Sequence, residues 1–96
     1  MVLVNEIKVT SDSIEPGCYA EDYINGCEME AQEVNGISTA KCRASYNSKC
    51  RLINLKSETT YSVTARSFRY GKARNIIYSD PTSPIYVNTG YLIDRS

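Results

Sequence analysis

The sequence lacks histidine and tryptophan, and its 96 residues contain no Cys-x-x-Cys pair. Histidine is a common acid–base group and metal ligand at neutral pH, so its absence argues against catalysis and against a zinc site. A phosphate-binding glycine motif is also missing, as is an Arg-Gly-Asp tripeptide of the integrin-binding type. We therefore expect no enzymatic activity, no catalytic residues, no cofactor, no metal and no small-molecule substrate.

The chain also has no apolar run long enough to cross a membrane. Residues 1–5 have neither the basic start nor the length of a secretory leader. The formal net charge is zero, which argues against nucleic-acid binding. We expect a module excised from a secreted protein or from the ectodomain of a membrane protein, with no direct membrane insertion.

The charge is nevertheless unevenly distributed along the chain. Residues 1–40 contain eight acidic residues and one basic residue, whereas residues 41–74 contain nine basic residues and one acidic residue. A bipolar binding surface is one interpretation of this pattern. The interpretation that we favour is that the two segments neutralise each other in the folded chain.

Four cysteines, Cys18, Cys27, Cys42 and Cys50, form an even number in a short chain. This count predicts a disulfide framework and an oxidising, extracellular compartment. The sequence by itself allows three pairings. A zinc site and buried free thiols are the alternatives to disulfides.

The composition favours an all-β class. The chain has eight tyrosines, many β-branched residues and no sustained helical periodicity. Its length suits a single domain. We expect this domain to cover residues 1–90, because Thr89-Gly90 follows the last predicted strand, and we expect a linker at residues 91–96.

The stretch from Leu55 to Ala65 organises the prediction of the second half. Leu55 ends an apolar run, and Tyr61, Val63 and Ala65 then alternate with polar residues at the period of two that a half-buried strand requires. A tyrosine at the start of such a strand can pack its ring inward and return its hydroxyl to the upstream backbone, as in the tyrosine corner of immunoglobulin-like sandwiches. We therefore assign structural roles to Leu55 and Tyr61.

Asn35-Gly36 lies between two alternating segments and is a strong hairpin signal, because both residue types tolerate positive φ. A two-residue turn fixes the register of the hairpin. The predicted opposite pairs are Val34 with Ile37, Glu30 with Lys41, Met29 with Cys42, and Glu28 with Arg43. Opposed residues share a face, so we expect both acid–base pairs outside the core and the Met29–Cys42 pair inside it.

Patterning and turn residues predict the other strands. We expect them at about residues 4–9, through Cys18 and Ala20, from Cys50 to about Leu55, from Tyr61 to Phe68, and at residues 85–88. Residues 69–77 break the alternation around Gly71 and are predicted to form a loop. Two Pro-containing turns precede the last strand and suit a strand at a sheet edge.

Several stretches resemble a fibronectin type III domain. LKSETTYSVTA, SFRYGK and SDPTSPIYVNTG are similar to the second half of such a domain, INGCEMEA to its third strand and CRLINL to its fifth. The resemblance spans about residues 7–90 and implies a seven-stranded antiparallel, immunoglobulin-like β-sandwich. Two features depart from the usual pattern: the tryptophan common on the second strand is missing, and ordinary members lack disulfides.

This layout also implies a pairing of the cysteines. Cys18 with Cys27 would join the second and third strands across the core, and Cys42 with Cys50 would tie the next two strands. The stretch CRASYNSKC is similar to the cross-link in the first domain of class II cytokine receptors and tissue factor.

The resemblance implies a non-catalytic protein-binding or spacer module of a cell-surface or secreted protein. The alternatives are a cytokine-binding domain of the class II receptor type, a stand-alone secreted effector such as an inhibitor or antigen, and an accessory domain of a larger enzyme.

The best candidate for a partner-binding site is the segment from Phe68 to Tyr78. It mixes basic with aromatic and aliphatic side chains, as protein interfaces do. The predicted partner-binding residues are Phe68, Arg69, Tyr70, Lys72, Arg74, Ile76 and Tyr78. The competing interpretation is that Phe68 and Tyr78 only complete strands and that the bases are solvated. The partner would be an extracellular or cell-surface protein.

Overall fold

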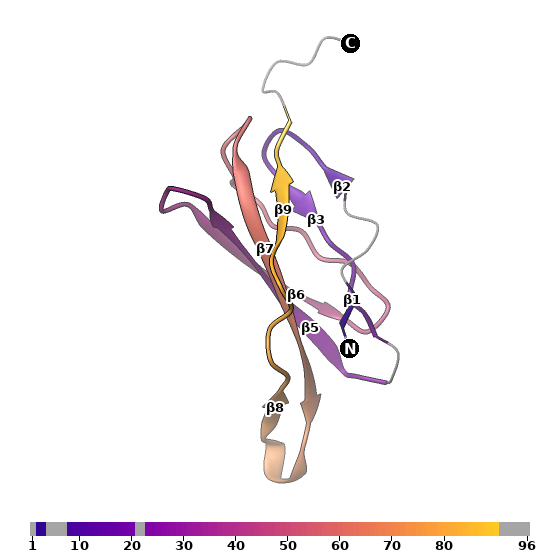
Figure 1. Ribbon diagram of the computed structural model, residues 1–96. Helices are drawn as coiled ribbons and strands as arrows, with labels where there is room; N and C mark the ends of the chain where they lie inside the picture. The colour runs from indigo at the N-terminus through magenta and orange to yellow at the C-terminus, as the bar shows by residue number, and fades with distance from the viewer. Residues whose placement is uncertain (1, 4–7, 21–22, 91–96) are drawn as a thin grey trace.

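The computed structural model describes residues 2–3, 8–20 and 23–90. Its main layer is an antiparallel sheet in the order β6-β5-β7-β8, with β9 also paired to β7 (Figure 1). The strands of this sheet are β5 (Gly26–Glu33), β6 (Thr39–Ser45), β7 (Thr60–Tyr70), β8 (Ile76–Tyr78) and β9 (Ile85–Asn88).

Short strand pairs form the second layer. Strand β1 (Val2–Leu3) pairs with β4 (Tyr19–Ala20), and β2 (Lys8–Val9) pairs with β3 (Ile14–Glu15). Figure 1 shows β1, β2 and β3 together on one side of the main sheet. The all-β sandwich predicted from the sequence is confirmed, with several predicted strands divided into shorter pieces.

The predicted strand from Cys50 to Leu55 is wrong as a continuous element. This segment makes one isolated bridge, from Leu52 to Ile14, rather than a ladder. Asn54 has a φ of 63°, which takes the chain out of the extended conformation. The segment still belongs to the second layer, because Ile14 and Leu52 exchange two backbone hydrogen bonds of 2.9 and 2.7 Å. Of the first predicted strand, residues 4–7 lie outside the described residues.

The predicted register of the β5–β6 hairpin is confirmed at the opposed pairs 28/43, 29/42 and 30/41. The turn chemistry differs from the prediction, since Asn35 has a positive φ of 65° but Gly36 does not. The Glu33 carboxylate packs against Gly36, where a Cβ atom would lie 2.2 to 2.5 Å from it. One oxygen of that carboxylate accepts a hydrogen bond from the Ser38 N–H.

The core lies between the two layers and contains both disulfides. Cys18 is bonded to Cys27, and Cys42 is bonded to Cys50, as the resemblance implied. Met29 and Ala31 of β5 point into this core, as the alternation predicted. Each disulfide therefore connects the main sheet to the second layer.

The predicted tyrosine corner is also confirmed. Tyr61 is fully buried, and its hydroxyl accepts a hydrogen bond from the backbone N–H of Lys56 at 2.9 Å. The Ser38 hydroxyl lies 2.9 Å from the same oxygen. Leu55 is buried beside Tyr61 in the core, so both residues have the structural roles assigned to them.

Strand β9 lies at the sheet edge, where the sequence predicted the last strand. Between β8 and β9, residues 79–84 leave the regular ladder and contain Pro81 and Pro84. The hydroxyl oxygens of Ser79 and Thr82 accept the N–H groups of Ser67 and Ala65, at 2.9 and 3.1 Å. These hydroxyl groups thus provide hydrogen-bond acceptors for backbone N–H groups of β7 where the strand ladder is interrupted.

The ion pairs agree with the interpretation that the two charged segments neutralise each other. In the part of the chain that the structure describes, every ion pair joins an acid of residues 1–40 to a base of residues 41–74. Glu30 and Lys41 are directly opposed and exposed, as predicted, but within these same residues no ion pair joins them.

Candidate functional site

The predicted binding loop is mostly a β-hairpin. Strand β7 continues through Tyr70, and β8 returns beside it with Phe68 opposite Tyr78 and Tyr70 opposite Ile76. The loop predicted at residues 69–77 was therefore too long, because the break in alternation at Gly71 marks only the turn. Gly26, the first residue of β5, pairs with Phe68. The hairpin therefore extends beyond this first residue of β5 and projects from the body of the molecule (Figure 1).

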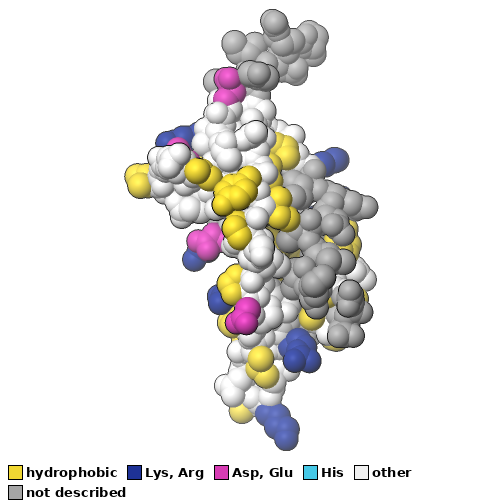
Figure 2. Space-filling view, in the orientation of Figure 1, with side chains coloured by type: hydrophobic (Ala, Val, Ile, Leu, Met, Phe, Trp, Pro, Cys, Tyr) yellow, Lys and Arg dark blue, Asp and Glu magenta, His cyan; other side chains and the backbone are white. Residues whose placement is uncertain are grey.

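The hairpin divides the predicted binding residues between its two faces. Phe68, Tyr70, Ile76 and Tyr78 share the face of the main sheet that points away from the core, here called the outer face. Arg69 lies on the opposite face, and its side chain is exposed. Figure 2 shows basic and hydrophobic side chains together at this end of the molecule.

Phe68 is not an exposed anchor, since only 4% of it is accessible. It opposes Gly26, and a Cβ atom at Gly26 would meet the Phe68 ring at 2.6 Å. The Arg43 guanidinium covers the ring at 4.6 Å from its centroid, and the rings of Tyr70 and Tyr78 contact it edge-on. Phe68 thus packs against Arg43, Tyr70 and Tyr78 and is not itself accessible to a partner.

Tyr70 and Ile76 are exposed at the end of this aromatic cluster, and Tyr70 has 59% of its surface accessible. The Asn25 side chain accepts a hydrogen bond from the Tyr70 N–H at 3.0 Å. This bond ties the projecting strand to the segment that precedes β5. Tyr70 is therefore a solvent-exposed aromatic ring on an anchored strand, as a binding residue requires.

The turn of the hairpin is held in an unfavourable backbone conformation. The Lys72 carbonyl accepts the N–H of Asn75, and both residues between them, Ala73 and Arg74, have positive φ values of 58° and 66°. Two consecutive left-handed residues form a type I′ turn, which favours asparagine and glycine. Alanine and arginine each carry a Cβ atom that makes this conformation costly.

A second feature of the outer face is a charge cluster around Glu28 of β5. One carboxylate oxygen accepts hydrogen bonds from the Arg43 guanidinium and from the Tyr78 hydroxyl, the latter at 3.1 Å. The other oxygen accepts the Arg66 guanidinium at 3.1 Å. These hydrogen bonds lower the pKa of Glu28, and the bond from Arg43 has the largest effect. Partial burial of the carboxylate acts in the opposite direction and raises the pKa.

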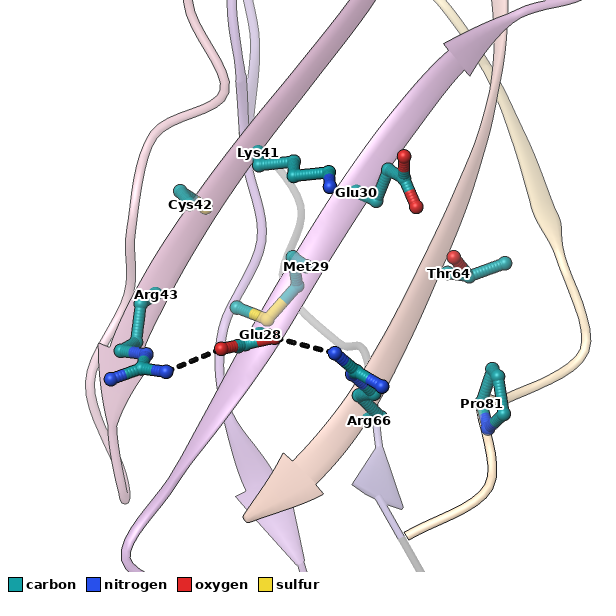
Figure 3. A pocket seen from close by; sticks show the side chains of 9 residues that line it. All are labelled: Glu28, Met29, Glu30, Lys41, Cys42, Arg43, Thr64, Arg66 and Pro81. Atoms are coloured by element: carbon teal, nitrogen blue, oxygen red, sulfur yellow. Dashed lines mark hydrogen bonds and ion pairs between the residues drawn. The ribbon is translucent and has the colours of Figure 1, made fainter. Parts of the chain in front are cut away.

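An open groove of about 580 Å³ lies over this cluster. Its base is on β5, its sides are on β6 and β7, and a proline of the segment between β8 and β9 borders it. Figure 3 shows the Glu28 carboxylate between the two arginines. The lining residues are Glu28, Met29, Glu30, Lys41, Cys42, Arg43, Thr64, Arg66 and Pro81.

This groove and most of the charge cluster were not predicted from the sequence. The hairpin register places Arg43 opposite Glu28, but Arg66 lies opposite Glu28 on the other neighbouring strand. The alternation along the strand did indicate that Arg66 points outward, because the preceding residue, Ala65, faces the core. The pairing of β5 with β7 was the missing information.

The described residues contain no group of three or more Cys, Asp or Glu residues that could hold a metal ion. All four cysteines are in disulfides. Among these residues, no helix is long and apolar enough to span a membrane.

Comparison with known proteins supports the fold. No family model matches the sequence, and a search of curated proteins finds no relative. A myokine structure matches with a TM-score of 0.65 and 15% identity, over 94% of this chain and 93% of that one. The FN5 domain of Drosophila Lar matches with a TM-score of 0.63 and 20% identity, over 92% and 95%. The chain therefore has the fold of a fibronectin type III domain, an all-β sandwich that here contains two disulfides.

Proposed function

We propose that the protein is a non-catalytic, extracellular protein-binding module whose projecting β7–β8 hairpin contacts the partner. The fold and the two disulfides are those of a generic extracellular-type module, and they support this proposal without naming a partner. The observation that carries it is the composition of the hairpin end. Three exposed bases and three exposed aromatic or aliphatic side chains lie there, on the paired strands and the turn that joins them: Arg69, Lys72, Arg74, Tyr70, Ile76 and Ile77.

The bases of the hairpin end are uncompensated. Within the described part of the chain, Arg69, Lys72 and Arg74 have no ion-pair partner, whereas Arg43 and Arg66 both bind Glu28. Three unpaired cations beside apolar side chains would suit a protein surface that carries acidic groups around an apolar patch. Spatial confinement to one hairpin favours this interpretation over scattered, solvated charges.

The strained turn is a second argument. Strained backbone costs stability and is often found at functional sites. Glycine at residue 74 would relieve the strain, yet the chain has arginine there, at the outermost point of the hairpin. A binding role for the Arg74 side chain explains why arginine rather than glycine occupies this position.

A direct test compares the binding of fluorescently labelled protein to cells before and after removal of the hairpin side chains. The variant replaces Arg69, Tyr70, Lys72 and Arg74 with alanine, and it should lose binding while it keeps its β-sheet circular dichroism. A control variant replaces two exposed residues elsewhere, Arg51 and Ile37, and should bind as the parent does. Unchanged binding by a folded hairpin variant would contradict the proposal.

Site-specific photo-cross-linking locates the contact. Ile77 of the hairpin and Ile53 of the second layer are almost equally exposed, at 53% and 52%. A benzophenone side chain at residue 77 should cross-link to a cell-surface protein, whereas the same group at residue 53 should not. Equal cross-linking from both positions would indicate contact without a preferred site.

A cytokine-binding domain of the class II receptor type is the second candidate. The observation that favours it is the Cys42–Cys50 disulfide, which ties β6 to the segment paired with Ile14. Surface plasmon resonance against a panel of helical cytokines tests this candidate. Binding that depends on the hairpin residues would support this candidate. If no cytokine of the panel binds, the cytokine-binding candidate is contradicted, and the cell-binding experiment still tests the general protein-binding proposal.

A further inference from the structure

The groove over Glu28 contains two arginines that are held in place from several sides. Arg43 binds Glu28 and packs on Phe68, while Arg66 binds Glu28 and packs on the Tyr78 ring at 4.0 Å. The hydrogen bonds to Glu28 use the Nη2 atom of each guanidinium. Since a guanidinium has five N–H donors, each arginine keeps donors for another group. The conformational entropy of these long side chains is already lost before a ligand arrives.

Arg43, Glu28 and Arg66 form one row across three neighbouring strands. A second row of polar side chains lies next to it. Glu30 is flanked by Lys41 on β6 and by Thr64 on β7. In the described residues neither Glu30 nor Lys41 has an ion-pair partner, and Figure 3 shows both lining the groove. The first row thus presents fixed donors, and the second presents an unpaired cation and an unpaired carboxylate.

The two rows are spaced as an extended polypeptide requires. Glu28 and Glu30 are two residues apart on one strand, so the rows lie about 7 Å apart. Side chains i and i+2 of an extended segment have the same spacing and point to the same side. One segment lying along β5 could therefore place one side chain in each row.

We infer that the groove binds an extended segment of a partner protein through an acidic side chain at the two arginines and a polar side chain two residues away at Glu30 and Lys41. The acidic group would accept the remaining donors of Arg43 and Arg66 as charge-assisted hydrogen bonds. An amide side chain at the second position both donates and accepts, so it would satisfy Glu30 and Lys41 together. Glu28 acts as a positioning residue that orients the two arginines.

The alternation of signs in the groove favours a polypeptide over a sulfated polysaccharide. The lining has three basic and two acidic side chains, and among the residues that the structure describes no ion pair engages Glu30. A polyanion with charge on every unit would place negative charge beside Glu30, which costs binding energy. An isolated acidic side chain avoids this repulsion.

The groove is a site separate from the hairpin end, and its lining shares no residue with the bases and apolar side chains proposed to bind there. It therefore does not depend on the proposed function. Alanine at Arg69, Tyr70, Lys72 and Arg74 should leave the groove intact, so failure of one proposal is distinguishable from failure of the other.

The experiment is an NMR titration of the ¹⁵N-labelled protein, which detects weak binding. The probe is a blocked synthetic peptide, Ser-Glu-Ser-Gln-Ser, and the control peptide has glutamine in place of the glutamate. The glutamate peptide should shift the signals of residues 28–30, 41–43 and 64–66, and the control peptide should bind at least about tenfold more weakly, as loss of a charged hydrogen bond implies. No binding by the glutamate peptide, or equal binding by both, overturns the inference.

Two variants of equal charge separate positioning from simple attraction. Glu28→Gln and Glu30→Gln each remove one negative charge from the same groove, so nonspecific attraction would strengthen acidic-peptide binding equally in both. Both variants are titrated with Ser-Glu-Ser-Ala-Ser, which lacks the side chain that would contact Glu30. If Glu28 orients the arginines, E28Q should weaken binding of this peptide about tenfold, while E30Q should strengthen it through the removed charge. Stronger binding by E28Q overturns the inference, as does a heparin fragment that binds the groove when the peptide does not.

Discussion

The guanidinium carbon of Arg43 lies 4.6 Å from the centroid of the Phe68 ring, on the outer face of the main sheet. Phe68 is nearly inaccessible although it is on the side of the sheet away from the core. The opposing residue, Gly26, has no side chain, so the ring lies close against the backbone of β5. This cluster joins the groove to the projecting hairpin.

Gly26→Ala should destabilise the fold by about 1–3 kcal/mol through overpacking. A Cβ atom at this position would meet the Ala44 carbonyl oxygen at 2.4 Å and the Phe68 ring at 2.6 Å. The matched control is Gly90→Ala, whose nearest contact would be 3.6 Å away. Urea unfolding of both variants measures the difference, and equal stability of the two would contradict the packing described here.

Tyr61→Phe should lower the free energy of unfolding by about 1–2 kcal/mol, because it leaves the partly buried N–H of Lys56 without its acceptor. Tyr86→Phe serves as the control, since Tyr86 is 65% exposed. That variant should stay within about 0.5 kcal/mol of the parent. Chemical denaturation followed by circular dichroism checks both values.

The two disulfides should contribute unequally to stability. They close loops of similar length, with sequence separations of 9 and 8, so the chain-entropy contribution is about 2–3 kcal/mol for each. Cys18 and Cys27 are fully buried, whereas Cys42 and Cys50 are partly accessible. Alanine at the buried pair adds a cavity cost, so C18A/C27A should unfold at lower urea than C42A/C50A, and the reverse order would be inconsistent with this burial.

The pKa of Glu28 should lie below the usual value of 4.5, with Arg43 as the largest cause. Because the folded-state pKa is depressed, the stability that Glu28 contributes is present above the unfolded pKa and is lost as the pH falls through the folded pKa. NMR titration of the Glu28 carboxyl carbon should give a low midpoint in the parent. Arg43→Gln should raise this midpoint more than Arg66→Gln, and a midpoint unchanged by either variant would contradict the charge cluster.

Arg74→Gly and Ala73→Gly should each stabilise the fold by about 0.5–1 kcal/mol. The relief of a left-handed residue is partly offset by the greater freedom of glycine in the unfolded chain. Their binding should differ, because Ala73→Gly keeps the Arg74 side chain and Arg74→Gly removes it. A stabilised R74G variant that binds cells as well as A73G does would show that the arginine is not a contact residue.

Much of the fold was predictable from local patterns. The period of two oriented Met29 and Ala31 toward the core, and the Asn35-Gly36 turn set the register of the β5–β6 hairpin. The tyrosine corner followed from Tyr61 at the start of an alternating strand. In each case the controlling interactions act within one strand or between two strands joined by a short turn, where the order of residues limits the geometry.

The candidate sites depended on contacts between distant segments. Arg66 and Tyr78 are 38 and 50 residues from Glu28, and only the pairing of β7 with β5 and of β8 with β7 brings them to the same carboxylate. Alternation indicated that Arg66 faces outward but not which strand lies beside it. The sequence by itself therefore determined the faces and turns of the strands, whereas only the tertiary structure decided which charges meet, because strand neighbours are selected by packing of the whole core.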